Sequence, residues 1–123
     1  MPDVLQERNG VAVLVCDPGG PVLATTEAAL DLIGAAGFGG AELVAVPAGR
    51  LDPSFFSLGT RFAGEIMQKF VNYRLRLAVV GDISAHLAAS GALRALVAES
   101  NRHDQVWFVP DLAALDVRLA AST

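Results

Sequence analysis

The sequence is poor in the residues from which many active sites are built. It has one cysteine and two histidines among 123 residues. Because a disulfide needs two cysteines, Cys16 cannot form one within the chain, and the protein is compatible with a reducing compartment. His86 and His103 have no cysteine or paired acid near them at the spacing of a metal site. The sequence therefore predicts no metal ion and no other cofactor.

Catalytic signatures are missing as well. The sequence contains no phosphate-binding glycine loop and no G-x-S-x-G segment, which forms the nucleophile elbow of many serine hydrolases. No residue is assigned a catalytic role on this basis. A non-enzymatic function is favoured over an enzymatic one.

Basic residues are few. Nine lysines and arginines, dispersed along the chain, stand against thirteen acids, which gives a net charge of -4 and a pI near 4.9. Such a chain has no general positive field for nucleic acid. The first ten residues lack the apolar core of a signal peptide, and no later run approaches the roughly 20 apolar residues of a membrane span. We expect a cytoplasmic protein that binds neither nucleic acid nor a membrane.

Apolar residues, in contrast, make up 53% of the chain and fall into short runs. The length suits one domain over residues 1–123. Asn9-Gly10, between apolar runs at residues 4–8 and 11–16, is typical of a tight hairpin turn. Further strands are predicted at residues 42–46, 75–80 and 105–109. Helices are predicted from Thr25 or Thr26 to about Ala36, over Ser57 to Tyr73, from Ser90 to about Asn101, and from Asp111 onward. This order, ββαβαβαβα, indicates an α/β fold with a mixed, mainly parallel sheet covered by helices.

The segment from Ser57 to Tyr73 carries two patterns on one predicted helix. An apolar stripe recurs at intervals of four and three, at Leu58, Phe62, Ile66, Phe70 and Tyr73. Beside the stripe lies a dense polar set, formed by Arg61, Glu65, Gln68, Lys69 and Asn72. The three charged residues are four apart, which predicts a ladder of exposed ion pairs that contribute about 0.2 to 0.5 kcal/mol each. The polar set is either a recognition surface, with Tyr73 at its apolar edge, or an ordinary solvated helix face.

Two further polar groups lie where predicted elements end. Asp82 and Ser84 follow a parallel strand, at the edge where open α/β sheets bind ligands, so they are either ligand-binding or loop-structuring residues. Glu99 and Asn101 end the next helix. Asn101 is expected to cap that helix, or both residues join the polar face of the long helix in a shared groove. The small residues Gly59, Ala63 and Gly64, together with Met67, would also let another element or subunit approach closely.

The order of elements resembles the STAS domain, the fold of bacterial anti-sigma-factor antagonists. A closer resemblance lies in three segments: F-F-S-L-G-T-R-F-A-G-E-I-M-Q-K-F-V-N-Y at Phe55 to Tyr73, L-A-V-V-G-D-I-S at Leu77 to Ser84, and E-S-N at Glu99 to Asn101. These segments are similar to the bacterial family catalogued as domain of unknown function 4180. That family has no established activity to carry over, so the resemblance implies membership and not a mechanism.

STAS antagonists typically place a phosphorylatable serine in Asp-Ser-Ser-Gly-Leu, at the amino end of the helix after strand three. The matching corner here reads D-P-S-F-F-S-L-G from Asp52 to Gly59. Ser54 and Ser57 are the nearest candidates, although Phe55 and Phe56 interrupt the motif. The resemblance implies a phosphorylation switch, whereas the residue types favour the alternative that Asp52, Ser54 and Ser57 cap turns.

Three functions remain open at this point. The leading one is a non-enzymatic regulatory or protein-interaction module that recognises a protein partner through the long helix. The second is a small-molecule-binding protein or enzyme with a pocket at the carboxyl ends of the strands, near Asp82, Ser84, Tyr73 and Glu65. The third is a structural homodimer whose polar surface is its own interface.

Overall fold

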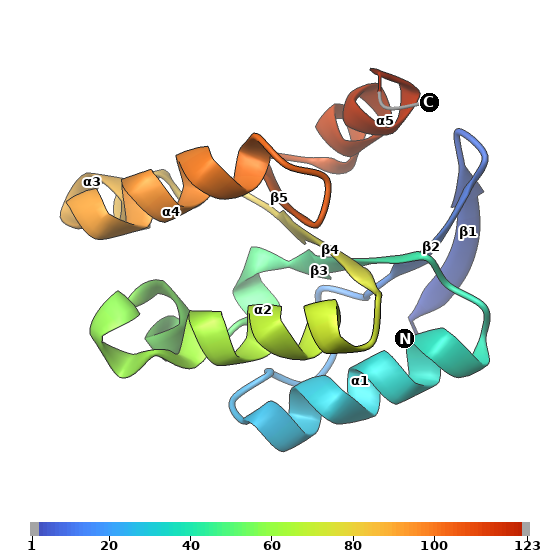
Figure 1. Cartoon of the computed structure of the whole chain (residues 1–123), viewed down its shortest axis with the longest axis horizontal. Helices are drawn as coiled ribbons and strands as arrows, with labels where there is room; N and C mark the ends of the chain where they lie inside the picture. The colour runs from blue at the N-terminus through green and yellow to red at the C-terminus, as the bar shows by residue number, and fades with distance from the viewer. Residues whose placement is uncertain (1–2, 122–123) are drawn as a thin grey trace.

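A five-stranded sheet in the order β1-β2-β3-β4-β5 organises the computed structural model, which describes residues 3–121 (Figure 1). The strands are β1 (Val4–Arg8), β2 (Val11–Val15), β3 (Leu43–Pro47), β4 (Arg76–Val80) and β5 (Val106–Val109). The helices are α1 (Thr26–Phe38), α2 (Phe62–Asn72), α3 (Ser84–Ala89), α4 (Gly91–Asn101) and α5 (Leu112–Ala121). Three 3-10 turns, η1 (Ala48–Arg50), η2 (Pro53–Phe56) and η3 (Leu58–Thr60), connect β3 to α2. The α/β class and the mixed, mainly parallel sheet are confirmed.

The amino-terminal hairpin forms as the sequence predicts. Asn9 and Gly10 adopt φ angles of 49° and 81°, which a two-residue turn between antiparallel strands requires. β1 and β2 pair without interruption from Val4 opposite Val15 to Arg8 opposite Val11. All later strand pairs are parallel.

The two faces of the sheet are covered by different helices, because right-handed crossovers between neighbouring parallel strands bring every crossover helix to the same face. Val44 and Val46 of β3 pack into the cluster that contains Ile33 of α1, Ile66 of α2 and Leu93 of α4. Leu43 and Ala45 point to the other face and pack with Leu115 and Leu119 of α5. Figure 1 shows α5 across the strands from α1 and α2. The strands are therefore apolar on both sides, as their continuous apolar runs predict.

Trp107 of β5 is enclosed on the α5 face with 1% of its surface exposed. Its indole Nε1 donates a hydrogen bond to the His103 carbonyl at 2.6 Å. The guanidinium carbons of Arg76 and Arg118 lie 4.6 and 4.5 Å from the ring centroid. Such cation–π contacts strengthen when they are desolvated. Arg76 is half-buried, and its Nη2 has no hydrogen-bond partner among the described residues. The contact with the Trp107 ring offsets part of the cost of this burial.

The predicted order ββαβαβαβα misses one helix. α3, at Ser84–Ala89, precedes α4, so the observed order is ββαβαβααβα apart from the 3-10 turns. No residue of α3 is fully buried, and a six-residue helix without a buried stripe has no periodicity that would reveal it. Ser90 does cap the following helix, because its Oγ accepts a hydrogen bond from the Leu93 N–H at 3.1 Å.

The long helix is shorter than predicted at both ends. Arg61 has a left-handed φ of 63°, so α2 begins at Phe62, and Leu58 belongs to the preceding 3-10 turn. At the other end the helix stops at Asn72, and Tyr73 is 62% exposed. The buried stripe therefore consists of Phe62, Ile66 and Phe70, and the assignment of Tyr73 to it was wrong. Across residues 3–121, no helix combines the length and the apolar character that crossing a membrane requires.

Candidate interaction surface on helix α2

The polar set predicted on the long helix borders an open hollow next to the start of α1. This polar hollow has a volume of about 470 Å³ and is lined by Thr26, Arg61, Gly64, Glu65, Gln68 and Lys69. Thr26 comes from the first turn of α1, which packs beside α2. Gly64 exposes the helix backbone there, because it has no side chain to fill the space.

The predicted ladder of ion pairs does not form. Among the described residues, no ion pair within 4.0 Å joins Arg61, Glu65 or Lys69 to another charged side chain. Arg61 is the N-cap residue of α2, and its carbonyl accepts a hydrogen bond from the Glu65 N–H at 3.0 Å. Its left-handed φ of 63° gives its side chain a different direction from that of a residue inside the helix, which the predicted pairing with Glu65 assumed. The polar contact that forms instead runs from Gln68 Nε2 to Asn72 Oδ1 at 2.8 Å. The charges of the polar hollow thus remain open to another molecule.

An apolar groove lies on the other flank of α2, between this helix and α4. Its volume is about 440 Å³. Its lining surface is mainly apolar, and the exposed polar side chains of Gln68 and Glu99 border it. The lining comprises Gly64, Met67, Gln68, Val71, Leu96, Glu99, Ser100, His103, Gln105 and Val106. Gly64 and Gln68 line both the polar hollow and the apolar groove. α2 is therefore a ridge with charged side chains on one flank and apolar ones on the other. We name the two depressions together the α2 surface.

Glu99 and Asn101 contact different parts of the protein. Glu99 lies on the rim of the apolar groove with Gln68, and its carboxylate contacts Arg102 Nη1 and His103 Nε2, each at 3.1 Å. Asn101 instead turns to β5, where its Oδ1 accepts from the Phe108 N–H at 2.8 Å and its Nδ2 donates to the Phe108 carbonyl at 3.2 Å. The shared groove thus contains Glu99 only. Asn101 therefore binds the edge of β5 and is the last residue of α4, whose C-cap is Arg102.

Asp82 and Ser84 border a separate depression, which we name the strand-end crevice. It measures about 300 Å³ and lies after β4 and β5, where it is also lined by Ile83, Leu87, Val97, Asn101 and Phe108. Asp82 Oδ1 accepts a hydrogen bond from the Ser84 N–H at 2.9 Å. Hydrogen bonds from Ser84 to the Asp82 carboxylate lower its pKa. Asp82 therefore structures the start of α3 in its ionised form, and this state does not supply a proton near neutral pH.

Tyr73 and Glu65 do not join Asp82 in one pocket. Tyr73 ends α2 just before β4 begins at Arg76, whereas Asp82 follows the last residue of that strand. The two residues thus lie at opposite ends of β4, and neither Tyr73 nor Glu65 lines the strand-end crevice. The predicted grouping was wrong, because it combined residues from both ends of the sheet.

Of the two candidate serines, Ser54 lies in the 3-10 turn η2 and Ser57 lies between η2 and η3, before α2. Ser54 Oγ donates to Asp52 Oδ2 at 2.6 Å, and the Ser54 N–H donates to the same oxygen at 3.0 Å. These two bonds lower the pKa of Asp52. Ser57 is exposed and precedes η3. Neither serine stands at the amino end of α2, which begins at Phe62.

Metal binding has no evident site in the described part of the chain. No group of three or more His, Cys, Asp and Glu side chains is placed there to hold an ion. The ring of His86 stacks on that of Phe56, with the ring centroids 4.2 Å apart and an angle of 12° between the ring planes.

A family model described as Domain of unknown function (DUF4180) matches residues 8–119, which include every element from β2 to β5 and most of α5. The chain belongs to this family. No significant match was found among curated proteins or among solved structures. The α2 surface, the strand-end crevice and both serine turns all lie inside the segment that defines the family.

Sequence reasoning missed the apolar half of the α2 surface in this family member. Val71 and Leu96 line the groove, yet they belong to two helices that are far apart in the sequence. One signal was available, since Met67 and Val71 are four residues apart and widen the buried stripe of α2 toward one side. Leu96 gave no comparable signal, because only the tertiary arrangement brings α4 to that flank.

Proposed function

We propose that the protein is a non-enzymatic regulatory or interaction module with STAS-like topology, which binds a protein partner through the α2 surface. The observation that carries this proposal is that a polar hollow and an apolar groove lie side by side along one helix, α2. Burial of apolar side chains supplies most of the affinity of a protein interface, and polar groups around them supply register and selectivity. The α2 surface offers both, with Gly64 and Gln68 between them.

The composition of the apolar groove suits a protein partner. Val71 is 45% exposed, and Met67 and Leu96 are half-buried, so a partner side chain would remove apolar surface from water at a gain of about 25 cal/mol per Å². The thioether of Met67 adapts to partners of different shape. On the opposite flank, the unpaired charges of Glu65 and Lys69 would find their counterparts on the same partner.

The STAS-like topology rests on the order of elements. A hairpin precedes alternating helices and parallel strands, and α5 lies across the sheet from the crossover helices. If the module is regulated by phosphorylation, as the resemblance implies, Ser57 is the exposed one of the two serines. A single buried thiol that has no second cysteine to pair with suits the reducing cytoplasm, where we place the protein.

The test is site-specific photocrosslinking in the native host. A photoreactive phenylalanine analogue at position 68 or 71 should give an adduct of one defined mass. The same analogue at position 117 on α5, where Val117 is 69% exposed, should not. Met67→Lys should remove the adduct by charging the apolar groove, and the double variant Glu65→Ala, Lys69→Ala should weaken it through the polar hollow. Both variants should keep the wild-type circular dichroism and melting temperature. Equal adducts from positions 68 and 117, or adducts that Met67→Lys does not reduce, would contradict the proposal.

A second candidate function is favoured by the strand-end crevice. Open α/β sheets bind small molecules at the carboxyl ends of their parallel strands, and the crevice occupies that place after β4 and β5. Its mainly apolar lining, together with Asp82 and Ser84, would suit a small ligand that has one hydrogen-bond donor. Native mass spectrometry of protein purified gently from its host distinguishes the two classes. A reproducible small-molecule mass that is lost in Leu87→Arg would support the crevice, whereas a retained protein partner would support the α2 surface.

A further inference from the structure

The two edge strands of the sheet, β5 and β1, differ in whether their outward backbone groups have hydrogen-bond partners. On β5, the side chain of Asn101 occupies both backbone groups of Phe108, the N–H at 2.8 Å and the carbonyl at 3.2 Å. An amide side chain in this position imitates one residue of a neighbouring strand, so this edge is closed at Phe108. No strand of the described chain pairs with the other edge, because the strand order ends at β1 (Figure 1).

The register of the hairpin shows which groups of β1 are open. In a hairpin with a two-residue turn, the residues that flank the turn form a hydrogen-bonded pair, and such pairs then alternate along the strands. Arg8 opposite Val11 is therefore hydrogen-bonded, as are Gln6 and Val4 with their partners. The N–H and carbonyl groups of Leu5 and Glu7 consequently point away from β2, along the open edge.

β1 has some of the devices that keep an edge strand from pairing and lacks others. Proteins protect such edges with short strands, charged side chains, prolines, bulges or covering elements, and β1 is five residues long and carries the charged residues Glu7 and Arg8. β1, whose sequence is V-L-Q-E-R, contains no proline, and its pairing with β2 has no bulge. Val4 and Leu5 are 48% and 46% exposed, so the open edge also presents apolar side chains.

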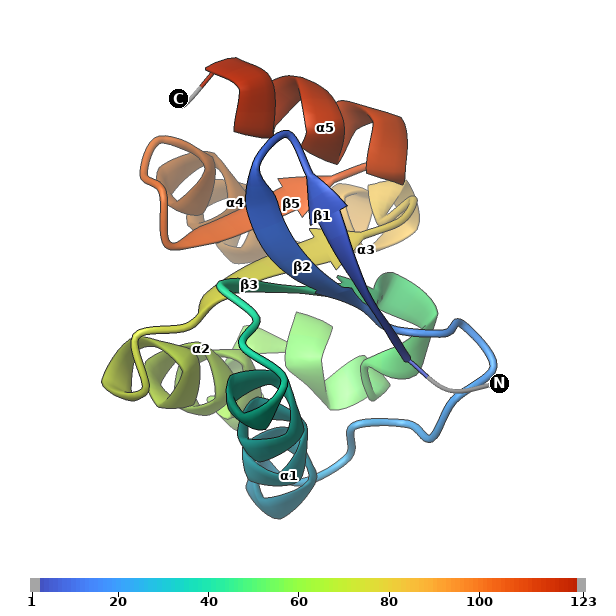
Figure 2. The ribbon, with the colours of Figure 1, turned by 90° about the vertical axis from the view of Figure 1, so that its right-hand side faces the viewer.

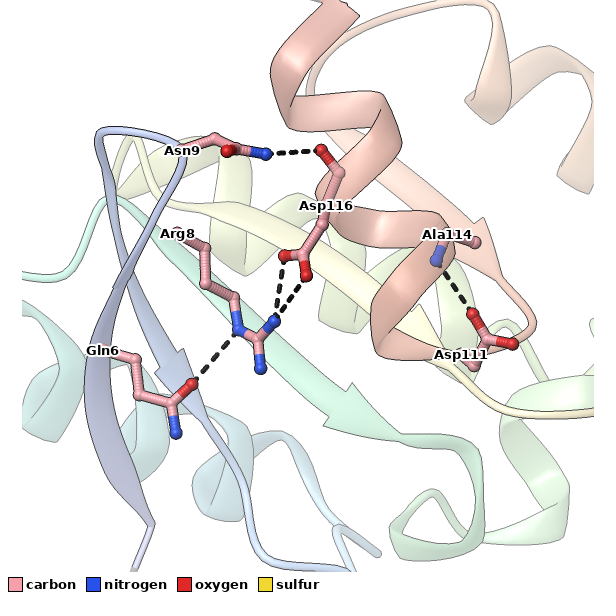
Figure 3. A network of polar contacts seen from close by, with 6 residues as sticks. All are labelled: Gln6, Arg8, Asn9, Asp111, Ala114 and Asp116. Carbon is pink, nitrogen blue, oxygen red and sulfur yellow. Dashed lines mark hydrogen bonds and ion pairs between the residues drawn. The ribbon is translucent and has the colours of Figure 1, made fainter.

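The strand is also held in place at both ends. Just before it, Asp3 accepts hydrogen bonds from Arg50 Nη1 and from the Asp17 N–H, each at 2.9 Å. At the other end, Arg8 Nη1 lies 2.9 and 2.8 Å from the two carboxylate oxygens of Asp116 on α5 (Figure 3). Asn9 Nδ2 donates to the Asp116 carbonyl at 2.7 Å. An edge that is already ordered loses little conformational entropy when a partner strand binds.

We propose that β1 pairs antiparallel with β1 of a second copy of this chain, about a two-fold axis at Gln6, and so joins the two sheets into one. In this register Leu5 lies opposite Glu7 of the second copy. All four outward backbone groups of each strand then find a partner. Gln6 faces its own equivalent, and Val4 faces Arg8.

The neighbouring registers are worse for electrostatic and hydrogen-bonding reasons. An axis at Leu5 would place Asp3 opposite Glu7, and an axis at Glu7 would place this carboxylate opposite its own equivalent. Like charges directly across a strand pair are destabilising. Only the axis at Gln6 both separates the acids and uses Leu5 and Glu7 together. This contact involves no residue of the α2 surface, so the two proposals stand or fall separately.

Cysteine crosslinking tests the register directly. Gln6 faces its equivalent in a non-hydrogen-bonded pair, whose Cα atoms lie about 4.5 Å apart, within the range that a disulfide bridges. Gln6→Cys should therefore form a covalent dimer on mild oxidation at least about tenfold faster than Val117→Cys, an exposed control on α5, because the pair raises the local thiol concentration. Leu5→Cys and Glu7→Cys should each link slowly alone and quickly when mixed. The native Cys16 is buried and does not take part.

Association without any crosslink is the second measurement. Sedimentation over a wide concentration range should show the 12.8 kDa chain forming a dimer. Leu5→Pro removes one outward N–H and leaves the bonds to β2 intact, so it should abolish the dimer while the circular dichroism is retained. The proposal is overturned if Gln6→Cys links no faster than Val117→Cys, or if the wild type stays monomeric at every concentration. A dimer that Leu5→Pro does not weaken would equally assign self-association to another surface.

Discussion

The guanidinium of Arg50 is buried against the carboxylate of Asp3, with Nη1 2.9 Å from Oδ1. Arg50 Nε also donates to the Pro21 carbonyl at 2.9 Å. The loop after β2 approaches this side chain so closely that a Cβ on Gly20 would lie 2.8 Å from the guanidinium carbon. One buried cation thus ties together the start of β1, the loop after β2 and the turn after β3.

We expect Asp3→Ala to destabilise the protein by about 1 to 3 kcal/mol, because the buried Arg50 loses the carboxylate that balances its charge. Asp3→Asn keeps a hydrogen-bond acceptor in place and should cost clearly less. Urea unfolding of both variants measures the difference. Equal stability of Asp3→Ala and the wild type would show that solvent replaces the carboxylate without loss.

The two aromatic residues at the end of α2 should differ in how much their replacement by alanine destabilises the protein. Phe70 is 1% exposed, so Phe70→Ala should lower the free energy of unfolding by about 3 to 5 kcal/mol. Tyr73 lies three residues later and is 62% exposed, so Tyr73→Ala should change it by less than about 0.5 kcal/mol. Thermal unfolding of the pair is the measurement. A large loss in Tyr73→Ala would mean that Tyr73 packs against the core after all.

The thiol of Cys16 should make stability depend on pH in the alkaline range. Burial raises its pKa from the usual 9.0 to about 12, and the neighbouring Asp3 charge adds to the rise. Because the folded state retains the proton that the unfolded chain loses above pH 9, this contribution is fully present below pH 9 and is lost as the pH rises toward 12. Denaturant unfolding between pH 8 and pH 10.5 should therefore show a steeper decline for the wild type than for Cys16→Ala. Parallel declines would refute the assignment.

Removal of the edge contact on β5 should also be costly. Asn101→Ala leaves the N–H and carbonyl of Phe108 without their partner, which should cost about 1 to 3 kcal/mol. Hydrogen exchange at the Phe108 amide should become faster in this variant. Asn72→Ala is the matched control, since it removes an exposed asparagine from the end of α2 and should be nearly neutral. Unchanged exchange at Phe108 would show that the edge is protected by other means.

Local chemistry explains the parts of the fold that the sequence predicts well. Asn9-Gly10 suits the positive φ angles of a hairpin turn, and the apolar runs around Val44 and Val79 match strands that are buried on both faces. α3 could not be predicted in this way, because its N-cap residue is Ile83, which makes no capping bond, and no buried stripe marks the helix. Tyr73 was misplaced because a periodic pattern does not show where the helix ends.

The candidate site, too, could be predicted only in part from the sequence. Glu65, Gln68 and Lys69 stand out by residue type on a single helix, so the sequence indicates the polar half of the α2 surface. The apolar half needs Leu96, which reaches α2 only through the packing of α4 on β5. The role of Asn101 depends on the turn that brings its amide beside Phe108, and residue type alone does not reveal it.

The enclosure of Trp107 gives the protein an internal optical probe. It is the only tryptophan in the chain, so its emission belongs to one known place between β5 and α5. Figure 2 shows the tip of the β1–β2 hairpin beside α5, and Arg8 and Asn9 hold Asp116 of that helix. A red shift of the fluorescence would therefore report any loosening of α5, including loosening that starts at the hairpin, without a dye or a label.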